Sequence, residues 1–167
     1  LDIYQRAFVY HDVDGSDLRW RVEHAQHLHP LDVPRFAELG VIASMQGVHA
    51  TSDGPWLPTR LGQDRTERTS SVWRNLIDAG ALINNGTDVP VENIDPVASF
   101  YSSVARVMKN GERLTPAMAM TRREALESYT INNAYAAFEE DVKGSLTPGK
   151  LADIVVLSQD IMTVAEE

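Results

Sequence analysis

Short apolar runs alternate with longer amphipathic segments along most of this chain. Three runs have the length and composition of strands, and each is followed by small or polar residues; they span 19–24, 41–45 and 81–85. Apolar residues spaced three and four apart predict helices elsewhere, at 1–10, 32–39, 72–79, 95–108, 121–129 and 130–138. Strands that alternate with helices predict right-handed crossovers and a parallel sheet, so the expected fold class is α/β.

Two segments depart from that pattern. Residues 47–63 are small, polar and rich in glycine and proline, which predicts a long loop of the kind that is often functional. The tail contains the short apolar stretches 144–146 and 151–158 on either side of a Thr-Pro-Gly-Lys turn, and we expect two short strands there. These strands do not belong to the parallel sheet and predict a separate small sheet.

Composition excludes several classes of function. The 167 residues suffice for a domain with a real core, but a net charge of −9 argues against nucleic-acid binding, which usually needs a basic face. No apolar run approaches the ~20 residues of a membrane span. The chain has no cysteine, so any metal site must use nitrogen and oxygen ligands.

A histidine or an aspartate ends or follows each of the three predicted strands. His24 ends the first strand, His49 follows the second, and Asp88 follows the third. The carboxyl ends of parallel strands share one edge, where α/β barrels carry out their chemistry. Two imidazoles and a carboxylate could ligate a divalent ion such as zinc, and Asp88 could take a proton from a hydrolytic water. Two plainer interpretations stay open, because histidines at strand ends often have structural hydrogen bonds and Asp88 also suits a turn.

The segments that carry these residues resemble the amidohydrolase superfamily. They are Arg21-Val-Glu-His-Ala-Gln26, Arg35-Phe-Ala-Glu-Leu-Gly-Val-Ile-Ala-Ser-Met-Gln46 with His49, Gly86-Thr-Asp-Val-Pro-Val91 and Gly144-Ser-Leu-Thr-Pro-Gly-Lys-Leu-Ala-Asp-Ile-Val-Val-Leu157. The similar subgroup includes N-substituted formamide deformylases and exoenzyme-regulatory-protein-like metal-dependent hydrolases. The resemblance covers nearly the whole chain, with its motifs in the family's order. One departure is Gly47, where the family often has proline, and we expect it to loosen the loop that carries His49.

The resemblance implies a (β/α)₈ TIM barrel with a small β-sandwich made from both chain ends. Residues 1–140 would be the second half of the barrel, and residues 141–167 would be part of the sandwich. His24 would end barrel strand five, His49 would follow strand six, and Asp88 would follow strand eight. By the same resemblance, the two histidines are metal ligands, and Asp88 is both a ligand and the general base.

The activity implied by the resemblance is metal-dependent hydrolysis of C–N bonds in small-molecule amides or N-formyl compounds, with one or two zinc ions. The family's His-x-His pair and its metal-bridging residue belong to the first half of the barrel and do not occur in this sequence. We therefore expect a part of a longer hydrolase that is inactive alone; the alternative is a non-catalytic binding or regulatory module. Open strand edges predict a homo-oligomer or association with the missing half, without nucleic-acid or membrane partners, and we expect a cytoplasmic location.

Overall fold

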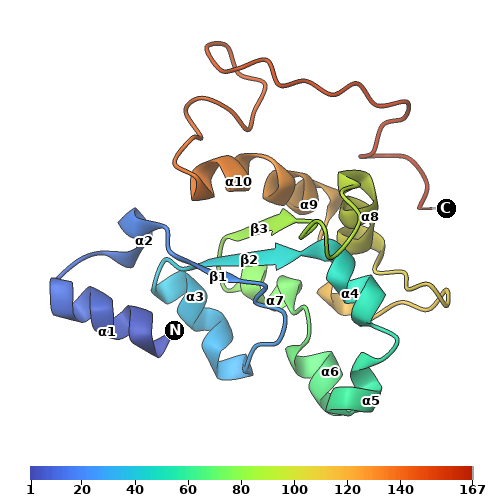
Figure 1. The fold of residues 1–167 in the computed structure, drawn as a ribbon, viewed down its shortest axis with the longest axis horizontal. Helices are drawn as coiled ribbons and strands as arrows, with labels where there is room; N and C mark the ends of the chain where they lie inside the picture. Colours follow the sequence, from blue (N-terminus) through green and yellow to red (C-terminus); the bar gives the residue numbers. More distant parts are fainter. Residues whose placement is uncertain (167) are drawn as a thin grey trace.

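Three parallel strands form the centre of the fold in this computed structural model, which describes residues 1–166 (Figure 1). The strands are β1 (Arg21–Glu23), β2 (Ile42–Gln46) and β3 (Ile83–Gly86), hydrogen bonded in the order β1-β2-β3. Their register places Ser44 between Glu23 and Asn84. The three-stranded parallel sheet and the α/β class predicted from the sequence are confirmed, with small shifts at the strand ends.

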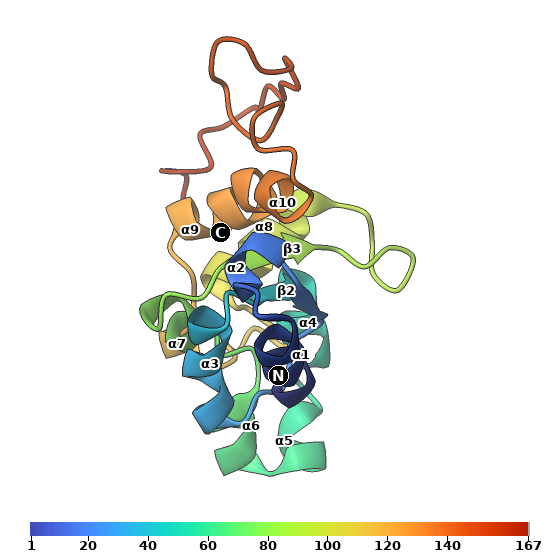
Figure 2. The same cartoon turned by 90° about the vertical axis from the view of Figure 1, so that its left-hand side faces the viewer.

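Helices cover the sheet and extend beyond it (Figure 1 and Figure 2). They are α1 (Asp2–His11), α2 (Gly15–Leu18), α3 (Val33–Glu38), α4 (Gly47–Asp53), α5 (Leu57–Leu61), α6 (Gln63–Thr69), α7 (Trp73–Asp78), α8 (Pro96–Ala105), α9 (Arg122–Tyr129) and α10 (Ile131–Ala136), with 3₁₀ turns η1 (Pro30–Asp32) and η2 (Pro116–Met118). Each helix that the periodicity predicts is present. None of the helices in residues 1–166 combines the length and the hydrophobicity needed to cross a bilayer.

The main core joins the sheet to α3 and α7. Phe36 of α3, Trp73 and Leu76 of α7, and Val41 and Met45 at β2 are almost completely buried. Each large apolar side chain contributes roughly 1.5–3 kcal/mol when it leaves water. This packing fixes the two helices relative to β2, while α9 and α10 contact β3. Helices packed at β2 and helices packed at β3 therefore hold the carboxyl ends of these strands in place.

The prediction of a loop at 47–63 is wrong. The segment forms α4, α5 and the start of α6, and both Ala50 and Leu57 are fully buried. Pro58 stands in the first turn of α5, where its missing N–H leaves no helical hydrogen bond unmade. Gly62, at φ +81°, separates α5 from α6. Glycine and proline thus mark helix boundaries here, and the helices are too short to show a periodic pattern.

The predicted strands at 144–146 and 151–158 are also wrong for the described chain. Residues 139–166 contain no strand, and they run outside α9 and α10 (Figure 2). Val156 is 91% exposed. The apolar composition typical of a strand is present, but a strand needs a hydrogen-bonded neighbour, and nothing within residues 1–166 pairs with this segment.

Helix side chains bond to backbone acceptors at both outer edges of the sheet. The Leu82 carbonyl accepts a hydrogen bond from β2, so the next carbonyl, that of Ile83, points away from β2; it accepts from Asn132 at 2.9 Å. On β1, the outward carbonyl of Arg21 accepts from the Tyr4 hydroxyl at 3.0 Å. Carbonyls that are already bonded are less available to an added strand, so part of each edge is shielded.

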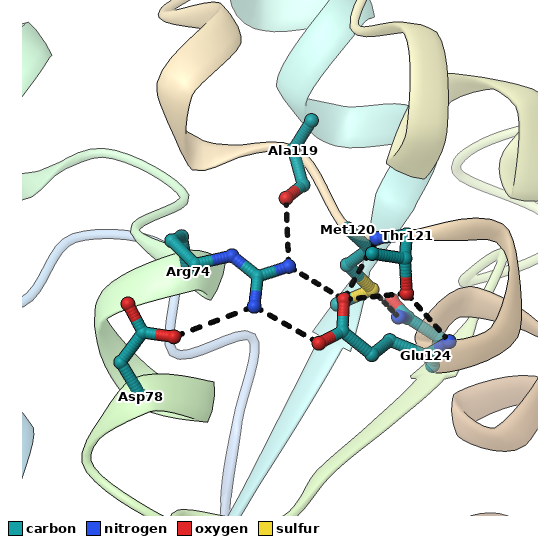
Figure 3. Close-up of polar contacts among 7 residues, drawn as sticks. Arg74, Asp78, Ala119, Met120, Thr121 and Glu124 are labelled. Atoms are coloured by element: carbon teal, nitrogen blue, oxygen red, sulfur yellow. Dashed lines mark hydrogen bonds and ion pairs between the residues drawn. The ribbon is translucent and has the colours of Figure 1, made fainter.

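An ion pair joins α7 to α9 (Figure 3). The two terminal guanidinium nitrogens of Arg74 lie 2.9 and 2.5 Å from the carboxylate oxygens of Glu124. Glu124 also forms the predicted capping box with Thr121, whose hydroxyl oxygen accepts from the Glu124 backbone N–H. The Arg74 guanidinium, with help from Thr121, lowers the pKa of Glu124 to about 2. Because α9 contacts β3, this pair also steadies the strand that leads to Asp88.

Candidate metal centre

The carboxyl ends of the three strands carry the three residues singled out in the sequence. His24 directly follows β1, Asp88 lies just beyond β3, and His49 lies in the first turn of α4, which begins where β2 ends. His24 and Asp88 both have left-handed backbone conformations, with φ of +66° and +59°. Histidine and aspartate are among the few residue types enriched in this conformation, and such strain is concentrated at functional sites.

The three side chains converge. Oδ2 of Asp88 lies 3.9 Å from Nδ1 of His24 and 3.9 Å from Nε2 of His49. One ligand atom from each residue lies within 4.8 Å of the other two, and the imidazole rings are stacked at 6.2 Å between centroids. These gaps are too wide for hydrogen bonds. Ligand atoms around one tetrahedral zinc ion, bound at about 2.0–2.2 Å, lie roughly 3.3–3.6 Å apart, so small side-chain rotations would bring all three to a common ion.

His49 gives the most direct indication that a ligand fits here. The residue is 9% exposed, and its buried Nε2 has no hydrogen-bond partner among the described residues. A buried polar atom left without a partner costs roughly 1–3 kcal/mol. A divalent cation would take up the free lone pair of a neutral imidazole, and the Asp88 carboxylate on the opposite side would offset the cation's charge. The residues present therefore fit a divalent metal ion.

Gln46 contacts the site, and sequence reasoning did not single it out. Its Oε1 lies 3.0 Å from Nδ1 of His24 and accepts a hydrogen bond when that nitrogen is protonated. Nδ1 is also the nitrogen that faces Asp88, so binding an ion through Nδ1 requires His24 to move its proton to Nε2 and to give up the bond to Gln46. The sequence signal that could have identified Gln46 is its position as the last residue of β2, at the edge that the other site residues share.

Gly47 does not loosen the segment that carries His49. It is buried in the first turn of α4, where an added Cβ would lie 2.1 Å from the Ser103 hydroxyl and 2.6 Å from the Tyr129 hydroxyl. Only glycine fits there without displacing these groups. The expected loosening is wrong because α8 and α9 pack directly against this turn.

The whole chain, residues 1–167, matches the model of the Amidohydrolase family. The chain belongs to this family. The resemblance found in the sequence motifs is thereby confirmed, including its subgroup. Metal dependence is a property of the family, and the roles of His24, His49 and Asp88 in this member stay predictions.

Relatives of this amidohydrolase extend well beyond its length. It is 38% identical over 159 residues to Protein LONG AFTER FAR-RED 3 of Arabidopsis thaliana, covering 95% of this chain and 27% of the relative. It is 30% identical over 146 residues to the N-substituted formamide deformylase of Arthrobacter pascens, covering 87% and 27%. An uncharacterized metal-dependent hydrolase from Pyrococcus horikoshii superposes with a TM-score of 0.80 at 27% identity, covering 99% and 33%. The chain thus spans about a quarter to a third of the proteins it matches.

Proposed function

We propose that this chain supplies part of the active site of a metal-dependent amidohydrolase that cleaves C–N bonds in non-peptide amides or N-formyl compounds. His24, His49 and Asp88 would hold a divalent ion, with zinc the best match to two imidazoles and a carboxylate. The buried, unpartnered Nε2 of His49 facing Asp88 is the observation that carries the proposal. The family match and the similarity to a formamide deformylase support the reaction class.

Asp88 has the central chemical role in this proposal. A divalent ion held by His24, His49 and Asp88 would lower the pKa of a bound water molecule and would polarise the substrate carbonyl. The Asp88 carboxylate accepts one proton from the attacking water as its oxygen bonds to the carbonyl carbon. Asp88 then passes this proton to the departing nitrogen as the C–N bond breaks, so acid and amine leave and the carboxylate is restored. His24 and His49 keep their positions throughout and hold no transferred proton.

We further propose that the three strands belong to the second half of a (β/α)₈ barrel. Residues 1–140 would form that half, and residues 141–167 would contribute to a small β-sandwich. Two findings support this placement. The chain covers 27% of its Arabidopsis relative. It also superposes, with a TM-score of 0.80, on one third of a hydrolase that is about three times as long. Remaining ligands, for one ion or two, would then come from outside these residues.

The test uses the full-length protein loaded with zinc. Hydrolysis of N-substituted formamides and simple amides is measured as release of formate or amine, for the unsubstituted protein and for Asp88→Asn. We expect a loss of roughly 10²–10⁴-fold in turnover, the range that general bases contribute, with the fold retained. Asp64→Asn is the matched control, because Asp64 is exposed and, among the described residues, its one ion-pair partner is Arg68 on the same helix.

Equal rates from the unsubstituted protein and Asp88→Asn would remove Asp88 from the mechanism. Tight zinc binding through His24 and His49 without turnover of any amide would instead support a non-catalytic binding module. Zinc content by elemental analysis, measured in parallel, separates these outcomes.

A further inference from the structure

One buried hydroxyl connects the segment that carries His49 to the segment that carries Asp88. Ser99 of α8 is completely buried. Its Oγ accepts a hydrogen bond from the backbone N–H of Val48, next to His49, at 3.2 Å. The same Oγ donates to the carbonyl of Gly86, two residues before Asp88, at 3.4 Å. Ser99 therefore links the segments that follow β2 and end β3, next to the candidate metal centre.

Tyr129 of α9 is a third hydrogen-bond partner of Ser99. Its hydroxyl lies 2.6 Å from Ser99 Oγ. Burial raises the pKa of Tyr129, so the phenol keeps its proton and can donate it. A serine hydroxyl has one hydrogen and two lone pairs. With Tyr129 as the donor, Tyr129 and Val48 N–H fill the two acceptor positions of Ser99, and the single hydrogen of Ser99 is directed to Gly86. In that arrangement every hydrogen-bonding position of this serine is used.

The first turn of α4 has no cap of its own. Gln46, the residue before this helix, makes no side-chain bond to it. The first N–H groups of a helix have no partner within the helix and need one from elsewhere. Ser99 supplies it for Val48, and Gly47 leaves just enough room for the Tyr129 hydroxyl to approach. The direction of this turn, and with it the imidazole of His49, thus depends on α8 and α9.

We propose that Ser99, supported by Tyr129, is a positioning residue that sets the separation of His49 and Asp88. The inference rests on the proposed metal site and adds residues that hold its ligands without touching the ion. Removing the Ser99 hydroxyl breaks its bonds to the backbone of Val48 and Gly86, and removing the Tyr129 hydroxyl takes away the group that holds Ser99 in place. A hydroxyl that does not touch the ion would then change the ion's affinity by holding the ligands in place, as supporting hydrogen bonds do in other metal sites.

Ser102 provides a matched control. It lies on the same helix, is also buried, and joins α8 to α4 through a 2.9 Å contact with the Thr51 hydroxyl, but it makes no bond to β3. Ser102→Ala therefore removes a comparable link between the helices and spares the connection to Gly86. A merely structural effect of losing one buried hydroxyl should be the same in both serine variants.

The experiment titrates Co²⁺ into the full-length, metal-free protein and records the visible absorption of the bound ion, with thermal midpoints measured in parallel. We expect Ser99→Ala and Tyr129→Phe to weaken Co²⁺ binding by about 10-fold or more and to change the absorption spectrum. Ser102→Ala should stay within about twofold of the unsubstituted protein. Tyr129→Phe keeps the ring and serves if Ser99→Ala does not fold.

Two results would contradict these claims, and they differ. If the unsubstituted protein binds Co²⁺ and all three variants bind it equally well with the same spectrum, the positioning role is wrong and the metal site stands. If the unsubstituted protein binds no Co²⁺, or binds it unchanged after His49→Ala, the proposed metal site itself is wrong and the positioning role falls with it.

Discussion

Nε2 of His49 lies 3.9 Å from Oδ2 of Asp88, and no described residue donates or accepts a hydrogen bond at that nitrogen. The two residues are 39 positions apart in the sequence, His49 in α4 and Asp88 in the segment after β3. The pairing of β2 with β3 brings these two segments together. A separation of this size is too long for a direct hydrogen bond. A cation between the two side chains would interact favourably with both.

Zinc should therefore stabilise the full-length protein. A ligand that binds only the folded state adds about 2.7 kcal/mol at a free concentration one hundred times its Kd, and the thermal midpoint should rise accordingly. His49→Ala should abolish most of this rise, whereas His29→Ala, which removes an exposed histidine outside the cluster, should not. Differential scanning calorimetry with and without zinc measures both. Equal rises in the two variants would rule out His49 as a ligand.

The Arg74–Glu124 pair predicts a stability change at acid pH. The pKa of Glu124 is lowered from 4.5 to about 2 in the folded protein, so the folded state binds the proton less tightly than the unfolded state does. This group's contribution is complete above about pH 4.5 and is lost as pH falls towards 2. Glu124→Gln should reduce the free energy of unfolding at pH 7 by roughly 1–3 kcal/mol, because a charge-assisted bidentate pair is broken.

Urea unfolding at a series of pH values checks this prediction. The difference between the Glu124→Gln variant and the unsubstituted protein should narrow steadily below pH 4.5. Glu127→Gln is a suitable control, because within residues 1–166 Glu127 pairs with just the exposed Arg123 on the same helix. This substitution should cost less than about 0.5 kcal/mol. A constant difference from pH 7 to pH 2.5 would show that the charge of Glu124 is not the cause.

The convergence of His24, His49 and Asp88 could be predicted from the sequence because it follows from topology. Once three strands are parallel and adjacent, their carboxyl ends meet, whatever the details of each side chain. The helix that holds His49 could not be predicted, because its first turn is stabilised by Ser99 and Tyr129, far away in the chain. Local composition at 47–63 carries no trace of those contacts.

The tail shows the opposite case. Its strand-like composition is a genuine local signal, but strand formation depends on a partner that the composition does not reveal. Val156 is therefore exposed where the pattern predicted a paired strand. Gln46 illustrates a third limit, because its contact with His24 is made across the gap between two strands and is visible only once their register is known.

Arg106 should be sensitive to conservative substitution. Its side chain is completely buried, its guanidinium donates to the carbonyls of Leu114 and Ser71, and it lies over the ring of Trp73. Burial lowers the pKa of its guanidinium from the usual range to about 10. A lysine cannot reach both carbonyls with a planar fork and is a harder charge to bury. Arg106→Lys should lower the free energy of unfolding by roughly 2–4 kcal/mol.

Chemical denaturation at pH 7 tests this, with Arg123→Lys as the control at a highly exposed position. The sign of the pH dependence is also fixed. The folded state releases the Arg106 proton more readily than the unfolded state, so the cost of the buried charge is complete below about pH 10 and is relieved as pH rises above that value. An Arg106→Lys variant as stable as the unsubstituted protein would show that this guanidinium is not needed for packing.

A polypeptide of residues 1–167 should self-associate. The tail exposes Ile154, Val155 and Val156 in succession along the chain, and exposed apolar surface drives association. The sheet edges are partly shielded by Tyr4 and Asn132, so we expect the tail to be the main contact. Light scattering should show a mass that rises with concentration, and Ile154→Lys with Val156→Lys should reverse it. Leu31→Lys, at an exposed leucine distant in sequence from the tail, should have little effect; a monodisperse monomer without any substitution would contradict the prediction.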